Sequence, residues 1–209
     1  MITLFDFETS GNCYKIRLML SFLGLEYSRK TVDIGKDENR TEAFLSLNPR
    51  GHIPVLVDGD TVIWDSQAIL VYLARQYGDE RWLPLDSLGL SQILQWLAVS
   101  ETEIQFGIQR ARAVLKFGRQ WNYKECQELG HKGLDVLNHQ LTHSKWLAAS
   151  RPTIADVGCF PYVALAAEAN ISLDSWPFVQ QWVDRFTQLP NYVSEVSAKF
   201  NPSKSHYHT

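Results

Sequence analysis

A change in sequence texture near residue 80 most constrains how this chain can fold. Before it, short β-branched and aromatic runs alternate with helix-like stretches, and from about residue 86 onward only helical periodicity is found. Alternating strands and helices predict an α/β layer with a small mixed sheet, whereas helices alone predict a helical bundle. We therefore expect an α/β domain over residues 1–79 and an all-helical domain over residues 86–209.

The periodicity also predicts the individual elements. The first domain is expected to follow the order strand 2–7, helix 13–23, strand 27–34, short helix 43–47, a hairpin of strands 53–57 and 61–64, and a helix closing near Gly78. The second domain is expected to contain a long helix over 90–117, bent around Gly107, and then helices at 124–141, 153–169, 177–189 and 191–199. The polar tail, 203–209, is expected to be loose.

Composition excludes several classes of protein. Hydrophobic residues make up 45% of the 209 residues and the net charge is −3, so a packed core is expected and nucleic-acid binding has little support. No apolar stretch approaches the ~20 residues of a membrane span, and a secretory signal is not expected from the first residues, which lack a basic region and lead directly into a strand. Three widely spaced cysteines, Cys13, Cys126 and Cys159, argue against a disulfide framework and favour a reducing, cytoplasmic location. No metal-binding spacing is present.

Several motifs carry a resemblance to a known family. Residues 48–56 read Asn-Pro-Arg-Gly-His-Ile-Pro-Val-Leu and are followed nine residues on by Asp65-Ser66. These motifs, with Ser10-Gly11-Asn12-Cys13 and the box from Thr153 to Asp156, resemble the glutathione S-transferases, and the likeness spans nearly the whole chain. It implies a thioredoxin-like N-terminal domain and an all-α C-terminal domain. It also implies a homodimer that takes glutathione as co-substrate, uses no metal, and conjugates it to a small electrophile in detoxification.

The resemblance assigns glutathione-binding roles. It implies a cis Ile53–Pro54 bond that aims the Ile53 main chain at the extended peptide ligand. Asp65 is expected to accept from the γ-glutamyl ammonium, while Ser66 and free N–H groups of the helix start hold the carboxylate; ordinary helix capping is the alternative. His52, Lys36 and Arg40 are candidates for the glycyl carboxylate, each otherwise a surface position, as is expected of Arg50.

Thiol activation is expected at the start of the first helix. A hydroxyl donor and the positive end of a helix dipole both favour the thiolate, which is the nucleophile. Ser10 is the preferred donor, and Asn12 and the hydroxyl of Tyr14 remain alternatives. Cys13 competes for a catalytic role, because a first-turn cysteine tends to have a lowered pKa; its alternative is a small buried apolar residue.

The helical domain is expected to supply the electrophile site. Glu103, Phe106 and Arg110 fall near one side of the long helix, with Gly107 leaving room for the ligand; core or dimer contacts are the alternative. Thr153 and Asp156 form a capping box whose role is structural. Two other functions remain open: a glutathione-dependent disulfide or peroxide reductase, and a non-catalytic interaction module of the same fold.

Overall fold

The first compact unit is built on a four-stranded mixed sheet. A computed structural model describes residues 1–194 of the chain. The strand order is β2-β1-β3-β4, with only the β1–β2 pair parallel. The strands are β1 (Ile2–Asp6), β2 (Tyr27–Thr31), β3 (Val55–Asp58) and β4 (Thr61–Trp64). The predicted α/β layer with its hairpin is therefore confirmed.

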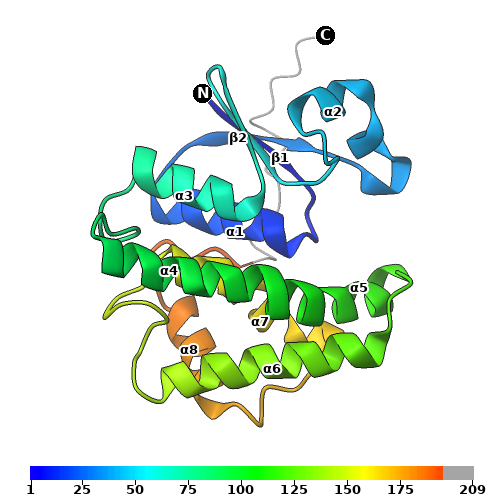
Figure 1. Ribbon diagram of the computed structural model, residues 1–209. Helices are drawn as coiled ribbons and strands as arrows, with labels where there is room; N and C mark the ends of the chain where they lie inside the picture. The colour runs from blue at the N-terminus through cyan, green and yellow to red at the C-terminus, as the bar shows by residue number, and fades with distance from the viewer. Residues whose placement is uncertain (195–209) are drawn as a thin grey trace. The chain divides into compact units, whose positions relative to one another are not determined.

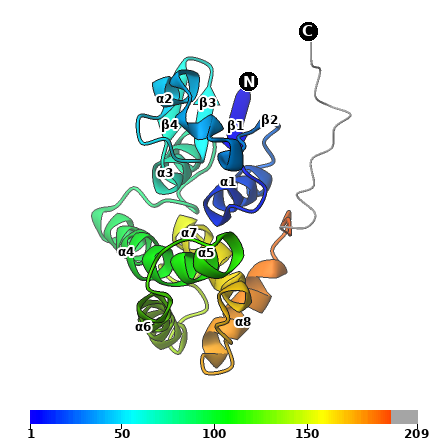
Figure 2. The ribbon, with the colours of Figure 1, turned by 90° about the vertical axis from the view of Figure 1, so that its right-hand side faces the viewer.

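Helices surround this sheet. A parallel strand pair needs a crossover, which α1 (Gly11–Phe22) provides between β1 and β2. In both views α1 lies beside α3 (Ser66–Gln76), whereas α2 (Glu42–Leu47) lies away from them (Figures 1 and 2). The predicted second strand is too long: it ends at Thr31, and short 3₁₀ turns at Ile34–Lys36 and Glu38–Arg40 follow.

The strand register explains how the sheet is covered on its two faces. Leu4 pairs with Leu56, and both are fully buried. The next pair, Phe5 with Val55, faces the opposite way because strand side chains alternate. Phe44 of α2 packs with this second pair, and the Phe5 and Phe44 rings meet edge to face at 6.0 Å. A change of one residue in register would exchange these two apolar sets.

Among the described residues the chain divides into two compact units, one formed by residues 1–73 and 190–194 and the other by Ala74–Leu189. The expected division into 1–79 and 86–209 stays a prediction, and residues 190–194 group with the first unit. There Tyr14 donates to the carbonyl of Val193 at 2.6 Å and Ser21 to that of Asn191 at 2.8 Å.

The predicted helix from Asn191 is wrong in its described part. Residues 191–194 are not helical, and Asn191 has a φ of 63°, outside the helical region. Residues 195–199 of that prediction, and the tail over 203–209, lie outside the described residues.

The second unit is helical. Figure 1 shows α4 and α5 in one continuous run alongside α6. The elements are α4 (Ser87–Val99), a π-helical segment (Ser100–Gln109), α5 (Arg110–Phe117), α6 (Tyr123–Leu141), α7 (Ile154–Ala164) and α8 (Pro177–Thr187). Helix α7 ends earlier than predicted, and a 3₁₀ turn over Ala166–Ala169 completes that stretch. The long predicted helix is thus continuous, but its middle is wound as a π-helix.

Gly107 permits a close helix contact. A Cβ added at Gly107 would lie 2.3 Å from the backbone nitrogen of Gly130 and 2.5 Å from its Cα atom. On the same face of α6, a Cβ at Gly133 would lie 2.9 Å from the Cβ of Glu103. The expectation that Gly107 leaves room for a ligand is therefore wrong, because the backbone of α6 fills that space.

Candidate functional site

Ser10 lies between β1 and α1 and forms the N-cap of α1. Its backbone is extended, and its Oγ accepts a hydrogen bond from the Cys13 N–H at 3.3 Å. An N-cap hydroxyl used as an acceptor still has its own proton to donate. Ser10 and Asn12 are both half-buried at this helix start. Ser10 is therefore placed to donate to a ligand at the positive end of α1.

Cys13 lies in a different environment from the one expected. It is fully buried, and burial first and the negative charge of Asp6 second raise the pKa of its thiol. The expected lowering of its pKa is wrong, because the loss of hydration outweighs the helix terminus and the Ser10 contact. The structure fits the alternative, in which Cys13 is a small buried apolar residue.

Tyr14 uses its hydroxyl within the fold. The hydroxyl donates to the Val193 carbonyl and also lies 3.1 Å from the hydroxyl of Tyr192. The side chain is almost completely buried. The structure thus assigns Tyr14 to holding the chain segment after Leu189 against α1, and the thiol-activating alternative loses support.

A buried charge cluster fixes the loop before Ser10. Asp6, at the end of β1, pairs with Arg17 at 2.7 Å and with Arg29 at 2.5 Å. Arg17 also donates to the carbonyl of Glu8 at 3.0 Å, within the β1–α1 loop. Removing one partner of such a buried pair leaves an uncompensated charge, which is strongly destabilising. The cluster therefore ties strand, helix and loop together around the position of Ser10.

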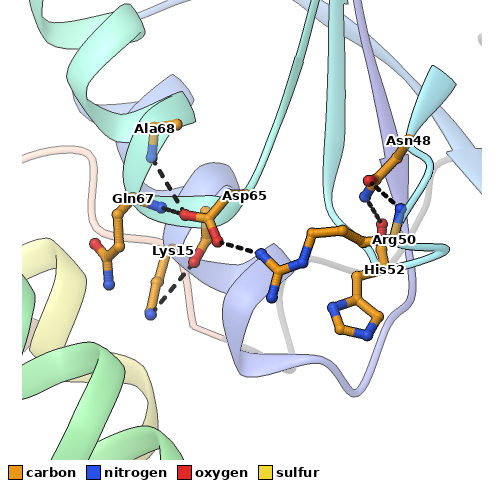
Figure 3. Close-up of polar contacts among 8 residues, drawn as sticks. Lys15, Asn48, Arg50, His52, Asp65, Gln67 and Ala68 are labelled. Carbon is orange, nitrogen blue, oxygen red and sulfur yellow. Dashed lines mark hydrogen bonds and ion pairs between the residues drawn. The ribbon is translucent and has the colours of Figure 1, made fainter.

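The loop before β3 is held by its own side chains. Asn48 donates to the carbonyl of His52 at 2.7 Å and accepts from the Arg50 N–H at 3.0 Å, as Figure 3 shows. Asn39 donates to the Gly51 carbonyl at 2.7 Å. The Ile53–Pro54 bond that follows is cis, as the resemblance implied.

The candidates for the glycyl carboxylate separate into two groups. Arg40 contacts the loop and donates to the Arg50 carbonyl at 3.3 Å. Burial, and then the positive charges of Arg50 and Arg40, lower the pKa of His52, which favours a neutral imidazole. Lys36 pairs instead with Asp33 at 3.1 Å on the exposed surface. The structure thus brings His52 and Arg40 together and occupies Lys36 elsewhere.

Asp65 caps α3 with both its main chain and its side chain. Its carbonyl accepts from Ile69 at 3.0 Å, and its Oδ1 accepts from the N–H groups of Gln67 at 3.0 Å and Ala68 at 3.5 Å. Its φ of 80° is uncommon for a residue other than glycine, and such strain clusters at functional sites. The expectation of free N–H groups at the start of α3 is corrected: Asp65 already occupies two of them.

Two residues outside the predicted site set also contact it. Arg50, for which a surface position was favoured, is half exposed and lies 3.4 Å from Oδ2 of Asp65. Lys15 of α1 is fully buried, and its Nζ donates to Oγ of Ser66 at 3.4 Å. Figure 3 shows the Arg50 guanidinium beside Asp65 and the Lys15 amine farther away, near Gln67. One sequence signal was available for Lys15, since apolar residues fill both sides of α1 and leave it no exposed face.

The three residues predicted for the electrophile site do not all lie together in the second unit. Arg110 lies over the ring of Phe106 at 4.2 Å and over the ring of Trp121 at 5.1 Å, and both aromatic residues are exposed. Glu103 packs against Gly133 of α6 instead. Phe106 and Arg110 thus share an aromatic–cationic cluster with Trp121, which the sequence did not indicate because it lies in the α5–α6 loop.

Other candidate sites are limited. A cavity of about 320 Å³ lies in the second unit between the start of α4 and residues 148–151, and no predicted site residue lines it. Within residues 1–194, no helix is long and apolar enough to cross a membrane. Over the same range, no group of three or more His, Cys, Asp or Glu side chains is placed to hold a metal ion.

Models of two protein domains match the chain. The N-terminal domain of glutathione S-transferases matches residues 9–76, and the C-terminal domain of glutathione S-transferases matches residues 93–190. The first match contains Ser10, Asp65 and Ser66, and the second begins within α4. Together the two matches cover most of the chain.

Individual proteins are similar over nearly its whole length. The chain is 30% identical over 198 residues to a maleylacetoacetate isomerase of Pseudomonas aeruginosa, covering 90% of this chain and 92% of that protein. It is 31% identical over 204 residues to the disulfide-bond oxidoreductase YfcG of Escherichia coli, covering 91% and 92%. A glutathione S-transferase structure from Pseudomonas fluorescens matches with a TM-score of 0.88 and 35% identity, covering 93% of this chain and 98% of that one. With a thioredoxin-like sheet followed by a helical unit, this chain belongs to the glutathione S-transferase family.

Proposed function

We propose that this protein is a glutathione transferase that activates the thiol of glutathione and conjugates it to small electrophiles. Membership in the family supports an enzymatic activity that depends on glutathione. The observation that carries the finer proposal is the Ser10 hydroxyl, which caps α1 and keeps a proton to donate. Asp65 and Ser66 would hold the γ-glutamyl group at the start of α3, with the Ile53 main chain, beside the cis bond to Pro54, along the peptide.

The free energy required of Ser10 is modest. The reference pKa of a thiol is near 8.5, and lowering it by about 2 units requires about 2.7 kcal/mol. One hydrogen bond to a charged acceptor contributes about 1.5–3 kcal/mol, and a helix terminus adds about 0.3–1 kcal/mol. A single hydroxyl at an N-cap is therefore sufficient to populate the thiolate at neutral pH. Asn12, half-buried one residue inside α1, is the alternative donor.

The test is the pKa of enzyme-bound glutathione, followed by thiolate absorbance against pH. We expect a pKa well below 8 in the wild type and a return toward the free value in Ser10→Ala, with Ser10→Thr keeping most of the shift. Asn122→Ala is the matched control, because Asn122 caps α6 with the same 3.3 Å contact but lies outside the glutathione-binding unit. An unshifted thiol in the wild type would remove the basis for this mechanism.

A second candidate function is glutathione-dependent disulfide reduction. The similarity to a disulfide-bond oxidoreductase favours it. Since Cys13 is fully buried with a raised pKa, the reacting sulfur would be that of glutathione in both functions. Parallel assays with a chloronitrobenzene and with a small mixed disulfide distinguish the two, and the faster reaction identifies the principal activity.

We place the electrophile at the cluster of Phe106, Arg110 and Trp121. The two aromatic faces suit a flat apolar acceptor, and the guanidinium suits negative charge that develops on it. Removing the Arg110 charge should raise KM for nitroaromatic acceptors more than for small alkyl ones. The Arg110→Met variant, assayed with both acceptors at saturating glutathione, tests this assignment.

Assembly and location complete the proposal. Exposed apolar residues support a homodimer: Val62 and Trp64 on the edge strand β4, and Leu85, Leu88 and Leu94 in the second unit. Light scattering during gel filtration would measure the mass, and a monomer would contradict the dimer. Three free thiols, all buried, fit a reducing cytoplasmic location.

A further inference from the structure

A buried lysine lies at the start of α3, where the proposed function puts the γ-glutamyl end of glutathione. Lys15 is fully buried in α1, and its Nζ donates to Oγ of Ser66 at 3.4 Å. Figure 3 shows its amine beneath Asp65 and beside Gln67. Burying a cationic side chain is costly, so the groups that Lys15 contacts at this position bear directly on its role.

Asp65 itself uses two of the N–H groups at the start of α3 that a bound carboxylate could use. Its Oδ1 already accepts from the N–H groups of Gln67 and Ala68. The hydroxyl and the N–H of Ser66 are therefore the neutral donors of this helix start that Asp65 leaves for the ligand. Neutral donors alone are weak compensation for a carboxylate that leaves water, because ionised groups are stabilised best by charged partners when buried.

The contact with Lys15 changes what Ser66 can do. A lysine amine in its charged form only donates, so Oγ of Ser66 acts as the acceptor in this contact. The serine proton is then directed away from Lys15 and toward a ligand. The amine also brings a positive charge close to any carboxylate that binds the serine hydroxyl.

We propose that Lys15 is a binding residue for the α-carboxylate of the γ-glutamyl group, acting by direct charge attraction and by orienting the Ser66 hydroxyl. Asp65 then takes the α-ammonium of the same zwitterion, and the pair recognises a free γ-glutamyl terminus rather than peptides in general. This inference rests on the proposed function, because it assumes that glutathione binds at Asp65 and Ser66.

The test uses two ligands that differ only in this carboxylate. Glutathione is compared with 4-aminobutyryl-cysteinyl-glycine, which keeps the amine and lacks the α-carboxylate. Calorimetry gives both dissociation constants for the wild type and for Lys15→Met, which keeps the chain length and removes the charge. We expect Lys15→Met to bind glutathione about 10- to 100-fold more weakly and the decarboxylated ligand about as well as the wild type does.

Controls separate a binding role from a structural one. Lys15→Arg keeps the charge and should keep most of the preference for glutathione. Lys30→Met removes another lysine of the same unit, one that lies over the Phe5 ring, and should leave both dissociation constants unchanged. Circular dichroism checks the fold of each variant, and Lys15→Gln replaces Lys15→Met if that variant does not fold.

The outcomes are distinct. Equal weakening of both ligands in a folded Lys15→Met protein would show that Lys15 only supports the fold, and unchanged glutathione affinity would remove its role altogether. A wild type that binds both ligands equally well would overturn carboxylate recognition without any variant, while leaving the proposed function intact. A wild type that binds neither ligand would instead count against the proposed function.

Discussion

Asp156 is the residue whose removal best tests what stabilises the second unit, because its buried carboxylate accepts hydrogen bonds from four donors. Its Oδ2 accepts from the Thr153 N–H at 2.9 Å and from the Thr153 hydroxyl at 3.2 Å. Its Oδ1 accepts from the Leu147 N–H at 3.1 Å and from the Trp182 indole at 3.0 Å. The capping box predicted from sequence is confirmed, and it extends to two segments that the local motif does not contain.

The Asp156→Ala variant should therefore lose more than a helix cap. A capping residue alone contributes about 0.5–2 kcal/mol. Truncation here also leaves buried N–H groups of Leu147 and Trp182 without their acceptor, at about 1–3 kcal/mol each. We expect the free energy of unfolding to fall by about 3–5 kcal/mol, measured by urea titration. Asp86→Ala is the control, because Asp86 caps α4 at an exposed position, and it should lose only about 1 kcal/mol.

The same carboxylate predicts a pH dependence. Burial raises the pKa of Asp156 to about 6 from its ordinary value of 3.8, against the opposing effect of its hydrogen bonds. The folded state then binds the proton more tightly than the unfolded state does. The contribution of Asp156 is therefore fully present below about pH 3.8 and is lost as the pH rises through about 6. A shift of about 2 units corresponds to about 3 kcal/mol.

Asp156→Asn isolates this effect, because asparagine does not titrate. Between pH 4 and pH 7, wild-type stability should fall by about 2–2.5 kcal/mol relative to Asp156→Asn, as followed by unfolding at each pH. A flat difference, or one of opposite slope, would refute the reasoning and show that the four donors outweigh burial. Glutathione affinity of the folded protein should stay unchanged in each Asp156 variant, because the residue acts only on stability.

Three further predictions follow from close contacts. Gly107→Ala should destabilise by about 1–3 kcal/mol in urea titration, since its Cβ would meet the Gly130 backbone; Gly133→Ala, which meets a side chain, should cost less. Cys13→Ala should keep both conjugating and disulfide-reducing activity, and selective loss of reduction would restore a catalytic role for the thiol. Arg50→Gln should bind glutathione about 2- to 5-fold more tightly by calorimetry, because the guanidinium at Asp65 no longer competes with the ligand ammonium; weaker binding would instead assign Arg50 to the ligand.

Local chemistry explains which parts of the fold were predictable from the sequence. The hairpin around Gly59, the apolar helices and the capping box of Thr153 all depend on residues close together in the chain, and the structure has each of them. The helix expected from Asn191 failed because contacts with Tyr14 and Ser21, far away in sequence, hold that segment in a non-helical form. The second strand is shorter than predicted for a related reason. Its last residue, Thr31, pairs with Asp6, which is the last residue of β1, so residues after Thr31 have no strand partner in β1.

The candidate site also contains residues that local motifs indicate and residues that only long-range packing brings there. Ser10, Asp65 and Ser66 came from motifs that resemble those of the family, and Ser10 and Asp65 have the capping contacts that local helix-start chemistry predicts, while their roles toward a ligand stay predictions. Lys15 and Arg50 could not be identified from spacing, since each reaches the site only when two distant elements meet. The lowered pKa expected of Cys13 was wrong because burial depends on packing, which a first-turn position does not reveal.

These long-range partners change how ligand binding should be understood. Asp65 is paired with Arg50, which is half exposed, while Lys15 is held in the interior against Ser66. A γ-glutamyl zwitterion would therefore exchange one cation for another at Asp65 and gain a new cation at Ser66. The exchange is nearly neutral, because an exposed ion pair contributes only about 0–1 kcal/mol. Discrimination in favour of the γ-glutamyl group then depends mainly on its carboxylate, so Lys15 and Ser66, rather than the more visible Asp65, should determine which peptides this site accepts.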